Sequence, residues 1–326
     1  MIQLFKSSQA VVLLFLAVYT FLLHFYLLLT PPQLHLQTAA PIGQLIDWVI
    51  KSIPASPPYI LPIVYTALVY VQALLLNLVL NRYRILGEYN YLAALCFVLL
   101  CAWIGDDLYY SPPFFANFFM LLALDKVNES ADEIGLLHSF DAGFLVGLAS
   151  LCYLPTAVLL LFVVISLNIN RFFNWRELLL VFAGAVIVYF LTFVGYFFVD
   201  ELPALLSHFT HIVNAVTQTP VSVWANISKV LGFALVFGIS IVFFQRQYYR
   251  SIVRVRNGLT ILVYLLAISI LSFLFMSRLS FAPVVVLLLP LTGLLAYSFS
   301  EIKTQRIAEL LHILLLVIAI WVQYFA

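Results

Sequence analysis

Charged residues are scarce in this sequence. Lys, Arg, Asp and Glu make up 9% of the 326 residues, whereas 65% of the residues are hydrophobic. A soluble globular domain has roughly a quarter of its residues charged, so the composition excludes that class. Apolar runs close to the length that spans a bilayer recur along the chain, and no polar stretch is long enough to fold alone. The sequence therefore predicts one integral membrane domain over residues 1–326.

Cysteine and clustered basic residues are also rare. Cys96, Cys101 and Cys152 lie in apolar segments without paired spacing or a neighbouring His, which favours simple packing over a zinc site or a disulfide framework. The net charge is only +1 and no basic tract is present, so nucleic acid is excluded as a partner. Membrane lipids are the partners that this composition predicts, and it identifies no protein partner.

Apolar windows between charged or Pro-rich breaks predict an all-α bundle of about 11 transmembrane helices. Residues 139–168 are too long for one span and are broken at Pro155, so two short helices are expected there. These two helices either both cross the membrane or form a re-entrant hairpin. The other spans are expected near residues 10–30, 58–80, 89–105, 112–124, 178–199, 230–245, 258–276, 281–299 and 307–325.

Positive charge divides unevenly between the two sets of loops. With the N-terminus inside, the inner loops hold twelve of the 15 Lys and Arg residues, and the outer loops hold Lys51, Lys229 and Arg278. Because Lys and Arg gather in cytoplasmic loops, this bias predicts a cytoplasmic N-terminus and an extracytoplasmic C-terminus.

Two long segments, residues 31–57 and 200–229, are expected on the outer side. Each contains an amphipathic stretch, PIGQLIDWVIKSI and DELPALLSHFTHIVNAV, which should lie in the plane of the membrane interface. The outer carboxylates predicted by this topology are Asp47, Asp106, Asp107, Asp200 and Glu201.

Ionisable side chains are nearly absent from the predicted spans. His24 is near the centre of one span, and Glu309 and His312 are near the end of another. Ion- and proton-coupled transporters usually carry such groups along their pathway, so this scarcity disfavours them. A facilitator for a neutral or lipid-like solute is left open, as is a non-enzymatic subunit of an envelope assembly or secretion system.

One long stretch resembles a known family. HSFDAGFLVGLASLCYLPTAVLLLFVVISLNINRFFNWRELLLVFAG is similar to a family of Bacteroidetes-type polytopic membrane proteins with no assigned activity, which carry the FDAGF, GLASL and NWRE elements. The likeness covers residues 77–185. It implies a bacterial inner membrane protein with a periplasmic C-terminus.

The layout also resembles the GT-C superfamily of polyprenyl-phosphate-dependent glycosyltransferases. Those enzymes have many spans, outer juxtamembrane helices after the first span, and a small-residue hairpin whose counterpart here is GFLVGLASLCYLP. Their catalytic base is an acidic residue of the first outer loop, where Asp47 is the only candidate. The resemblance implies transfer of a sugar from a polyprenyl-phosphate donor at the extracytoplasmic face.

Such a transfer needs a carboxylate to accept the proton of the acceptor hydroxyl. Asp47 or the adjacent pair Asp106 and Asp107 are the expected bases. Gly105 and Pro112 predict a chain turn, without which adjacent side chains would diverge. The alternative for Asp106 and Asp107 is a solvated loop that ends a span. The alternative for Asp47 is an ordinary helical ion pair with Lys51, four residues later.

The transfer also needs cations or a metal at the donor phosphate. Lys51 and Arg278 are the expected phosphate-binding residues, with snorkelling to the lipid headgroups as the alternative for Arg278. No cofactor or metal site is identified, and a divalent metal is left open.

Small and capping residues predict details of the middle region. The G-x-x-x-G spacing of Gly143 and Gly147 is typical of closely packed membrane helices. Asp141, after Ser139, is expected to cap that helix, and Asn174 to cap the next one.

Overall fold

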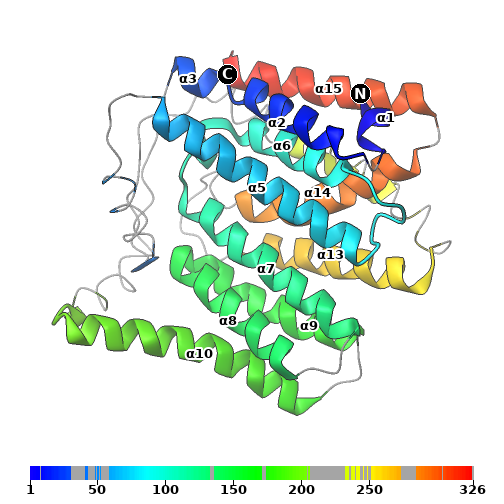
Figure 1. Ribbon diagram of the computed structural model, residues 1–326. Helices are drawn as coiled ribbons and strands as arrows, with labels where there is room; N and C mark the ends of the chain where they lie inside the picture. Colours follow the sequence, from blue (N-terminus) through cyan, green and yellow to red (C-terminus); the bar gives the residue numbers. More distant parts are fainter. Residues whose placement is uncertain are drawn as a thin grey trace.

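The computed structural model describes residues 1–7, 9–30, 59–132, 136–170, 174–203, 251–272, 284–302 and 304–324, together with short pieces between 41 and 52 and between 205 and 248. Every regular element in these residues is helical (Figure 1). The elements are α1 (Ile2–Phe5), α2 (Val11–Leu23), α3 (Tyr26–Leu29), α5 (Ile60–Arg82), α6 (Leu92–Ile104), the 3-10 turn η1 (Gly105–Leu108), α7 (Pro112–Asp132), α8 (Leu136–Cys152), the 3-10 helix η2 (Leu154–Leu159), α9 (Leu160–Asn170), α10 (Trp175–Phe198), α13 (Val253–Ser272), α14 (Val284–Glu301) and α15 (Gln305–Tyr324).

Length and hydropathy make this chain a membrane-embedded helical bundle. Within the described residues, α5, α10, α13, α14 and α15 are long and apolar enough to cross a membrane. Shorter apolar helices are formed by α2, α6, α8 and the η2–α9 pair. The predicted all-α membrane class is thereby confirmed.

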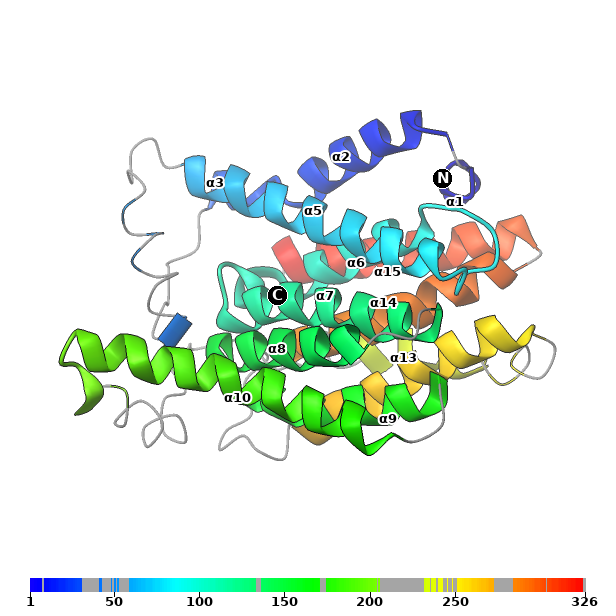
Figure 2. The same ribbon diagram turned by 60° about the horizontal axis from the view of Figure 1, so that its bottom comes forward.

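Consecutive helices mostly run in opposite directions, so the chain turns at two opposite ends of the bundle (Figures 1 and 2). At one end, the N-terminal amine lies 3.4 Å from the Glu309 carboxylate, and Arg82 lies 3.4 Å from Asp125. We name this the Arg82 end. At the other end, the ring of Tyr26 packs against that of Tyr324 beside the turn η1. We name this the η1 end.

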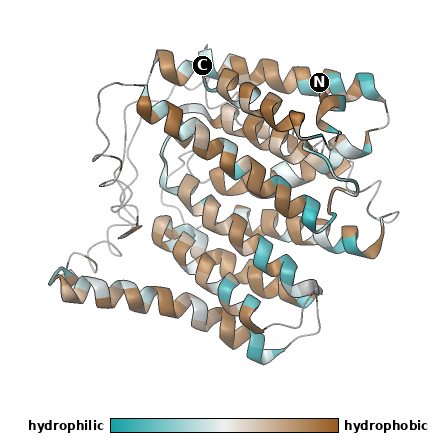
Figure 3. Cartoon of the chain, in the orientation of Figure 1, coloured by the Kyte–Doolittle hydropathy of each residue, from teal (hydrophilic) through white to brown (hydrophobic). Residues whose placement is uncertain are grey.

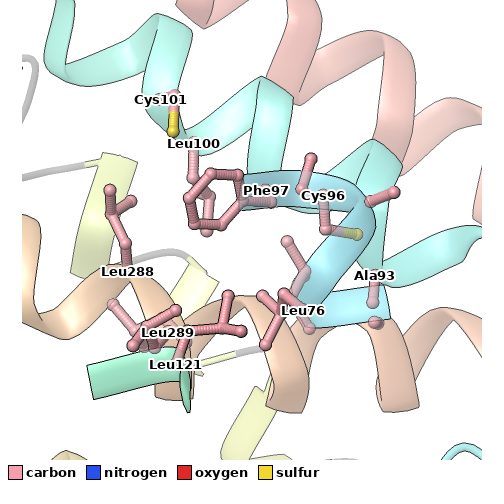
Figure 4. Close-up of a cluster of buried hydrophobic side chains, with 14 of the residues drawn as sticks. Leu76, Ala93, Cys96, Phe97, Leu100, Cys101, Leu121, Leu288 and Leu289 are labelled. Carbon is pink, nitrogen blue, oxygen red and sulfur yellow. The ribbon is translucent and has the colours of Figure 1, made fainter. Parts of the chain in front are cut away.

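Helix α6 forms the centre of the bundle. All of its residues from Leu92 to Ile104 are buried, and it packs against α5, α14 and α15. Phe97 of α6 belongs to a cluster of buried side chains that also contains Leu76 of α5 and Leu288 of α14 (Figure 4). A helix that is apolar on every side belongs in such a central position.

Helices α8 and α10 pack with their backbones almost in contact. A Cβ added to Gly143 would overlap the carbonyl oxygen of Val181, and one added to Gly184 would overlap that of Phe140. Further along, Ser150 Oγ hydrogen-bonds Tyr189 Oη at 2.6 Å, so the two helices run parallel. The structure confirms that Gly143 supports close helix packing, and supplies Gly184 as its counterpart.

The chain breaks where Pro155 predicted a break. Tyr153 is extended with φ −148° and ψ 102°, and Pro155 opens the 3-10 helix that leads into α9. The cap at Asn174 is also confirmed, because its side chain accepts a 3.1 Å hydrogen bond from the backbone N–H of Arg176.

Two local predictions were wrong. The first predicted span, residues 10–30, is not one helix: α2 ends at Leu23, and His24 separates it from α3. Helix α8 begins at Leu136, so Ser139 and Asp141 lie inside it and do not cap it. Hydrophobic residues between Leu136 and the FDAGF motif let the helix start earlier than the capping pattern suggests.

Candidate functional site

Three of the predicted site residues, Asp47, Lys51 and Arg278, lie outside the described residues. The same holds for most of the predicted interfacial segments, residues 31–57 and 200–229. These predictions stay predictions. The structure describes the backbone of Asp106 and Asp107, but not their side chains.

Asp106 and Asp107 lie on the tight turn that the sequence predicted. Gly105 ends α6 with φ 65° and ψ −132°, a conformation that only glycine adopts readily. The chain then forms the 3-10 turn η1 and enters α7 at Pro112, where a missing N–H costs nothing. Residues 106 and 107 therefore lie at the η1 end on a short and sharply bent segment of the backbone.

An aromatic cluster lies against this turn, centred on the buried ring of Tyr65 from α5. The Tyr65 ring centroid is 5.1 Å from Tyr109, 5.7 Å from Tyr110, 5.2 Å from Phe114 and 5.9 Å from the imidazole of His24. Tyr109 and Tyr110 directly follow η1, so the rings connect the carboxylate turn to α2 and α5. Edge-to-face and tilted contacts of this kind hold aromatic rings in fixed positions.

One tyrosine hydroxyl ties the turn to a neighbouring helix, and a second lies beside it. Tyr110 Oη donates a 2.9 Å hydrogen bond to the backbone carbonyl of Leu61. Burial raises the pKa of Tyr110 to about 12, so this hydroxyl stays protonated and keeps donating at neutral pH. Tyr26 Oη lies 3.7 Å from the place that a Cβ on Gly105 would take. The turn is thus held from α5, and α3 lies next to it.

His24 has a defined tautomer. Its Nδ1 is 3.0 Å from the carbonyl oxygen of Thr20. A carbonyl can only accept, so Nδ1 carries the proton and Nε2 of the neutral imidazole carries a lone pair. His24 is only 2% exposed, and its Nε2 has no hydrogen-bond partner in the part of the chain that the structure describes.

The Arg82 end is organised by ion pairs. Lys126 Nζ lies 2.8 Å from Glu129 Oε2, and His138 Nδ1 lies 3.6 Å from the same carboxylate. The hydrogen bond from Lys126 is the main reason that the pKa of Glu129 is lowered. The acidic stretch after Leu124 is therefore a paired helical face at the end of α7.

The described cations gather at one end of the bundle, together with paired carboxylates such as Asp125 and Glu129, and the hydrophilic colouring gathers toward this Arg82 end (Figure 3). The carboxylates Asp106, Asp107, Asp200 and Glu201 belong to segments at the η1 end. Every Lys and Arg whose side chain the structure describes lies in segments at the Arg82 end: Lys6, Arg82, Arg84, Lys126, Arg176, Arg254, Arg256 and Arg306.

No metal centre emerges from the described residues, which contain no group of three or more His, Cys, Asp or Glu side chains placed to hold an ion. The three cysteines are buried thiols, in agreement with their predicted packing role. The chemistry that the η1 end offers is therefore that of two carboxylates, tyrosine hydroxyls and an imidazole lone pair.

Sequence reasoning missed the partnership of His24 and Tyr65. The available signal was that His24 is an ionisable residue inside an otherwise apolar predicted span, which marks a functional position in membrane proteins. Tyr65 gave no comparable signal, because tyrosine is frequent throughout this chain.

Comparisons with known proteins assign no family. No family model, no curated protein and no solved structure matches the chain. The functional argument therefore rests on the residues and their placement.

Proposed function

We propose that this chain is a membrane glycosyltransferase that transfers a sugar from a polyprenyl-phosphate donor at the η1 end. The observation that supports this most directly is the glycine-dependent turn that carries residues 106 and 107 and leads directly into a buried His and Tyr cluster. A helical membrane bundle with carboxylate residues on a turn at one end suits a donor whose lipid tail is anchored and whose phosphate lies at the headgroup plane. A GT-C-like arrangement with about 11 spans is part of this proposal.

In the proposed reaction, a hydroxyl of the acceptor attacks the anomeric carbon of the donor sugar. The bond between that carbon and the phosphate oxygen breaks, and its electron pair leaves with the polyprenyl phosphate. The hydroxyl proton passes to the carboxylate of Asp106 or Asp107, which acts as general base. Asp47 stays a second candidate for this role, and Lys51 and Arg278 are the proposed partners of the departing phosphate.

The distribution of charge supports an extracytoplasmic η1 end. Lys and Arg favour the cytoplasmic side, and all the described cations lie in segments at the Arg82 end. In the proposed orientation the chain sits in a bacterial inner membrane with its N-terminus in the cytoplasm. The carboxylate turn then faces the periplasm.

The test uses right-side-out bacterial membrane vesicles that contain the full chain and receive polyprenyl-phosphate hexose with a labelled sugar. Asp106→Asn combined with Asp107→Asn should lower release of label from the donor by about 10²–10⁴-fold, the range for loss of a general base. Asp125→Asn, which alters the ion pair with Arg82 at the other end, should leave release unchanged.

Sidedness is checked in the same vesicles with a membrane-impermeant maleimide. This reagent should not react with the three native thiols, because they are buried. Glu201→Cys should react in intact vesicles and Arg84→Cys only after lysis. Wild-type vesicles that release no more label than empty ones would rule out the transferase and favour a scaffold subunit or a facilitator. Full release by the double variant would discard this pair as the base.

A further inference from the structure

Arg84 occupies a backbone position that normally belongs to glycine. It follows the end of α5 and has a left-handed φ of 54°. Its N–H donates a 3.0 Å hydrogen bond to the backbone carbonyl of Asn81, and the next N–H, of Ile85, donates one of 2.9 Å to that of residue 80. These bonds form a Schellman motif, whose left-handed position favours glycine, so the chain keeps an arginine there at a cost in backbone strain.

Two more arginines lie where helix electrostatics opposes them. Arg254 and Arg256 are in the first turn of α13, which contains no acidic residue. The N-terminal end of a helix carries partial positive charge, so cations are unfavourable there, whereas the C-terminal end of α5 favours the charge of Arg84. The helix dipole can therefore explain the positive charge at one of these two places, and not at both.

The fold brings the end of α5 and the beginning of α13 together. Ile85, directly after Arg84, packs against Gly258 of α13, where an added Cβ would lie only 2.6 Å from Ile85 Cγ1. Gly258 lies four residues after Arg254, and residues four apart share one face of a helix. Arg84 and Arg254 therefore belong to neighbouring segments of the backbone, with Arg256 in the same helical turn. We name Arg84, Arg254 and Arg256 the three-arginine patch.

Two of these three arginines have no carboxylate partner among the described residues. Neither Arg84 nor Arg256 forms an ion pair there, although Glu88 lies in the same loop as Arg84. By contrast, Arg82 and Lys126 at the same end of the bundle have carboxylate partners at 3.4 and 2.8 Å. Like charges repel, so charge complementarity calls for an external anion at the patch.

Large apolar side chains lie exposed beside the patch. Ile252 and Val253, just before Arg254, are 69% and 63% exposed, and Tyr89 in the loop after α5 is 55% exposed. Both α5 and α13 are long and apolar enough to cross a membrane. Tyrosine and arginine at the ends of such helices are typical of the headgroup level, where long basic side chains reach the lipid phosphates. The anion that suits the patch is therefore part of a membrane lipid.

We propose that the three-arginine patch binds the phosphate headgroup of an anionic phospholipid in the leaflet at the Arg82 end. The planar guanidinium groups match the oxygens of a phosphate, and basic residues next to a membrane surface attract anionic lipids. The headgroup carries a net negative charge, as in phosphatidylglycerol, because a zwitterionic headgroup would leave the charge of the patch uncompensated. This proposal does not depend on the transferase function.

Lipid binding to the full chain tests the patch without requiring any activity. The protein in detergent is titrated with phosphatidylglycerol or phosphatidylcholine, and native mass spectrometry gives the Kd of the first bound lipid. We expect tighter binding of phosphatidylglycerol. Arg84→Gly and Arg254→Gln should each raise its Kd about fivefold, which corresponds to about 1 kcal/mol. Arg176→Gln, which removes an exposed arginine from the first turn of α10, is the control and should leave Kd unchanged.

Arg84→Gly also separates lipid binding from folding. Glycine suits the left-handed position, and this relief offsets the extra flexibility that glycine gives the unfolded chain. The unfolding midpoint of the variant in phosphatidylcholine nanodiscs should therefore stay at the wild-type value. Phosphatidylglycerol in the nanodiscs should raise the midpoint of wild type more than that of Arg84→Gly, because a ligand stabilises the state that binds it.

Four results would overturn the patch as a lipid site. The first is equal binding of the two lipids by wild type, and the second is unchanged Kd in both Arg84→Gly and Arg254→Gln. The third is an equal rise of Kd in Arg176→Gln, which would show diffuse attraction along this end of the bundle. The fourth is displacement of the lipid by soluble glycerol phosphate at the same concentration, which would assign the patch to a soluble anion. A lower midpoint of Arg84→Gly in phosphatidylcholine would make Arg84 a structural residue and would remove it from the patch.

Discussion

The two ends of this bundle differ in the charge of their polar groups. At the Arg82 end, Lys126 pairs with Glu129 at 2.8 Å, and Asn81 exchanges hydrogen bonds of 2.6 and 3.3 Å with the backbone of Asn90. At the η1 end, the imidazole lone pair of His24 is buried with no hydrogen-bond donor among the described residues. Unpaired buried groups also occur at the Arg82 end, where Ser139 Oγ has no partner in the described part of the chain. The ends therefore differ in charge, since every Lys and Arg whose side chain is described lies in segments at the Arg82 end.

The halves of α10 repeat this contrast in their packing. In the half near the Arg82 end, Val181, Gly184 and Val188 are buried against α8. In the other half Phe190 and Phe198 are 61% and 80% exposed, as expected for side chains in lipid. Helix α10 is therefore tightly packed only in its half near the Arg82 end.

The largest expected effect comes from breaking this tight packing. Gly184→Val places a side chain on the backbone of α8 and should destabilise the protein by about 3 kcal/mol. Gly195→Val, on the same helix, has no atom within 4 Å of the new Cβ and should change stability by less than about 0.5 kcal/mol. Thermal unfolding in lipid nanodiscs measures both. Equal effects would show that α10 is held along its whole length and would remove the contrast.

An intermediate effect should separate paired from unpaired polar groups. Asn81→Ala leaves the N–H and C=O of Asn90 buried without partners and should cost about 2 kcal/mol. His24→Phe removes an acceptor that already lacks a donor, so its free energy of unfolding should stay within about 0.5 kcal/mol of wild type. The same nanodisc unfolding assay applies. A large loss in His24→Phe would mean that the histidine is structural.

The smallest effect is the pH dependence of the partly buried ion pair between Lys126 and Glu129. The pKa of Glu129 is lowered from its ordinary 4.5, mainly by the hydrogen bond from Lys126. The pair therefore contributes its full stabilisation above pH 4.5 and loses it as the pH falls through the lowered pKa. The pKa of Lys126 is raised from 10.5, so its contribution is complete below 10.5 and is lost at higher pH.

Because solvent still screens this partly buried pair, Glu129→Gln should cost only about 0.5 kcal/mol at neutral pH and nothing in strong acid. Unfolding midpoints from pH 3 to 7 measure this, with Glu177→Gln, an exposed carboxylate in the first turn of α10, as control. A constant difference between Glu129→Gln and wild type across this range would exclude the ion pair as its source.

Much of the helical layout followed from apolar length. The predicted spans 178–199 and 307–325 correspond to α10, Trp175–Phe198, and α15, Gln305–Tyr324. The break near Pro155 was also predictable, because proline removes a backbone donor wherever it stands. The break at His24 was not, since no proline or glycine marks it and hydropathy continues across it.

The candidate site was predictable only in part. Gly105 and Pro112 signalled the turn under Asp106 and Asp107, because their backbone preferences are local. The contact of His24 with Tyr65 joins residues from different helices, and hydropathy carries no information on which faces of apolar helices meet.

The sequence by itself determined that this chain is a helical membrane bundle, where its main helices lie, and how its charges are biased, because these depend on composition and on the local backbone. The tertiary structure decided that α6 is central, that α8 and α10 meet at glycines, and that an imidazole lone pair lies buried near the carboxylate turn. Those features depend on which side chains approach across helices, and in an apolar environment close packing and hydrogen bonding select that pairing.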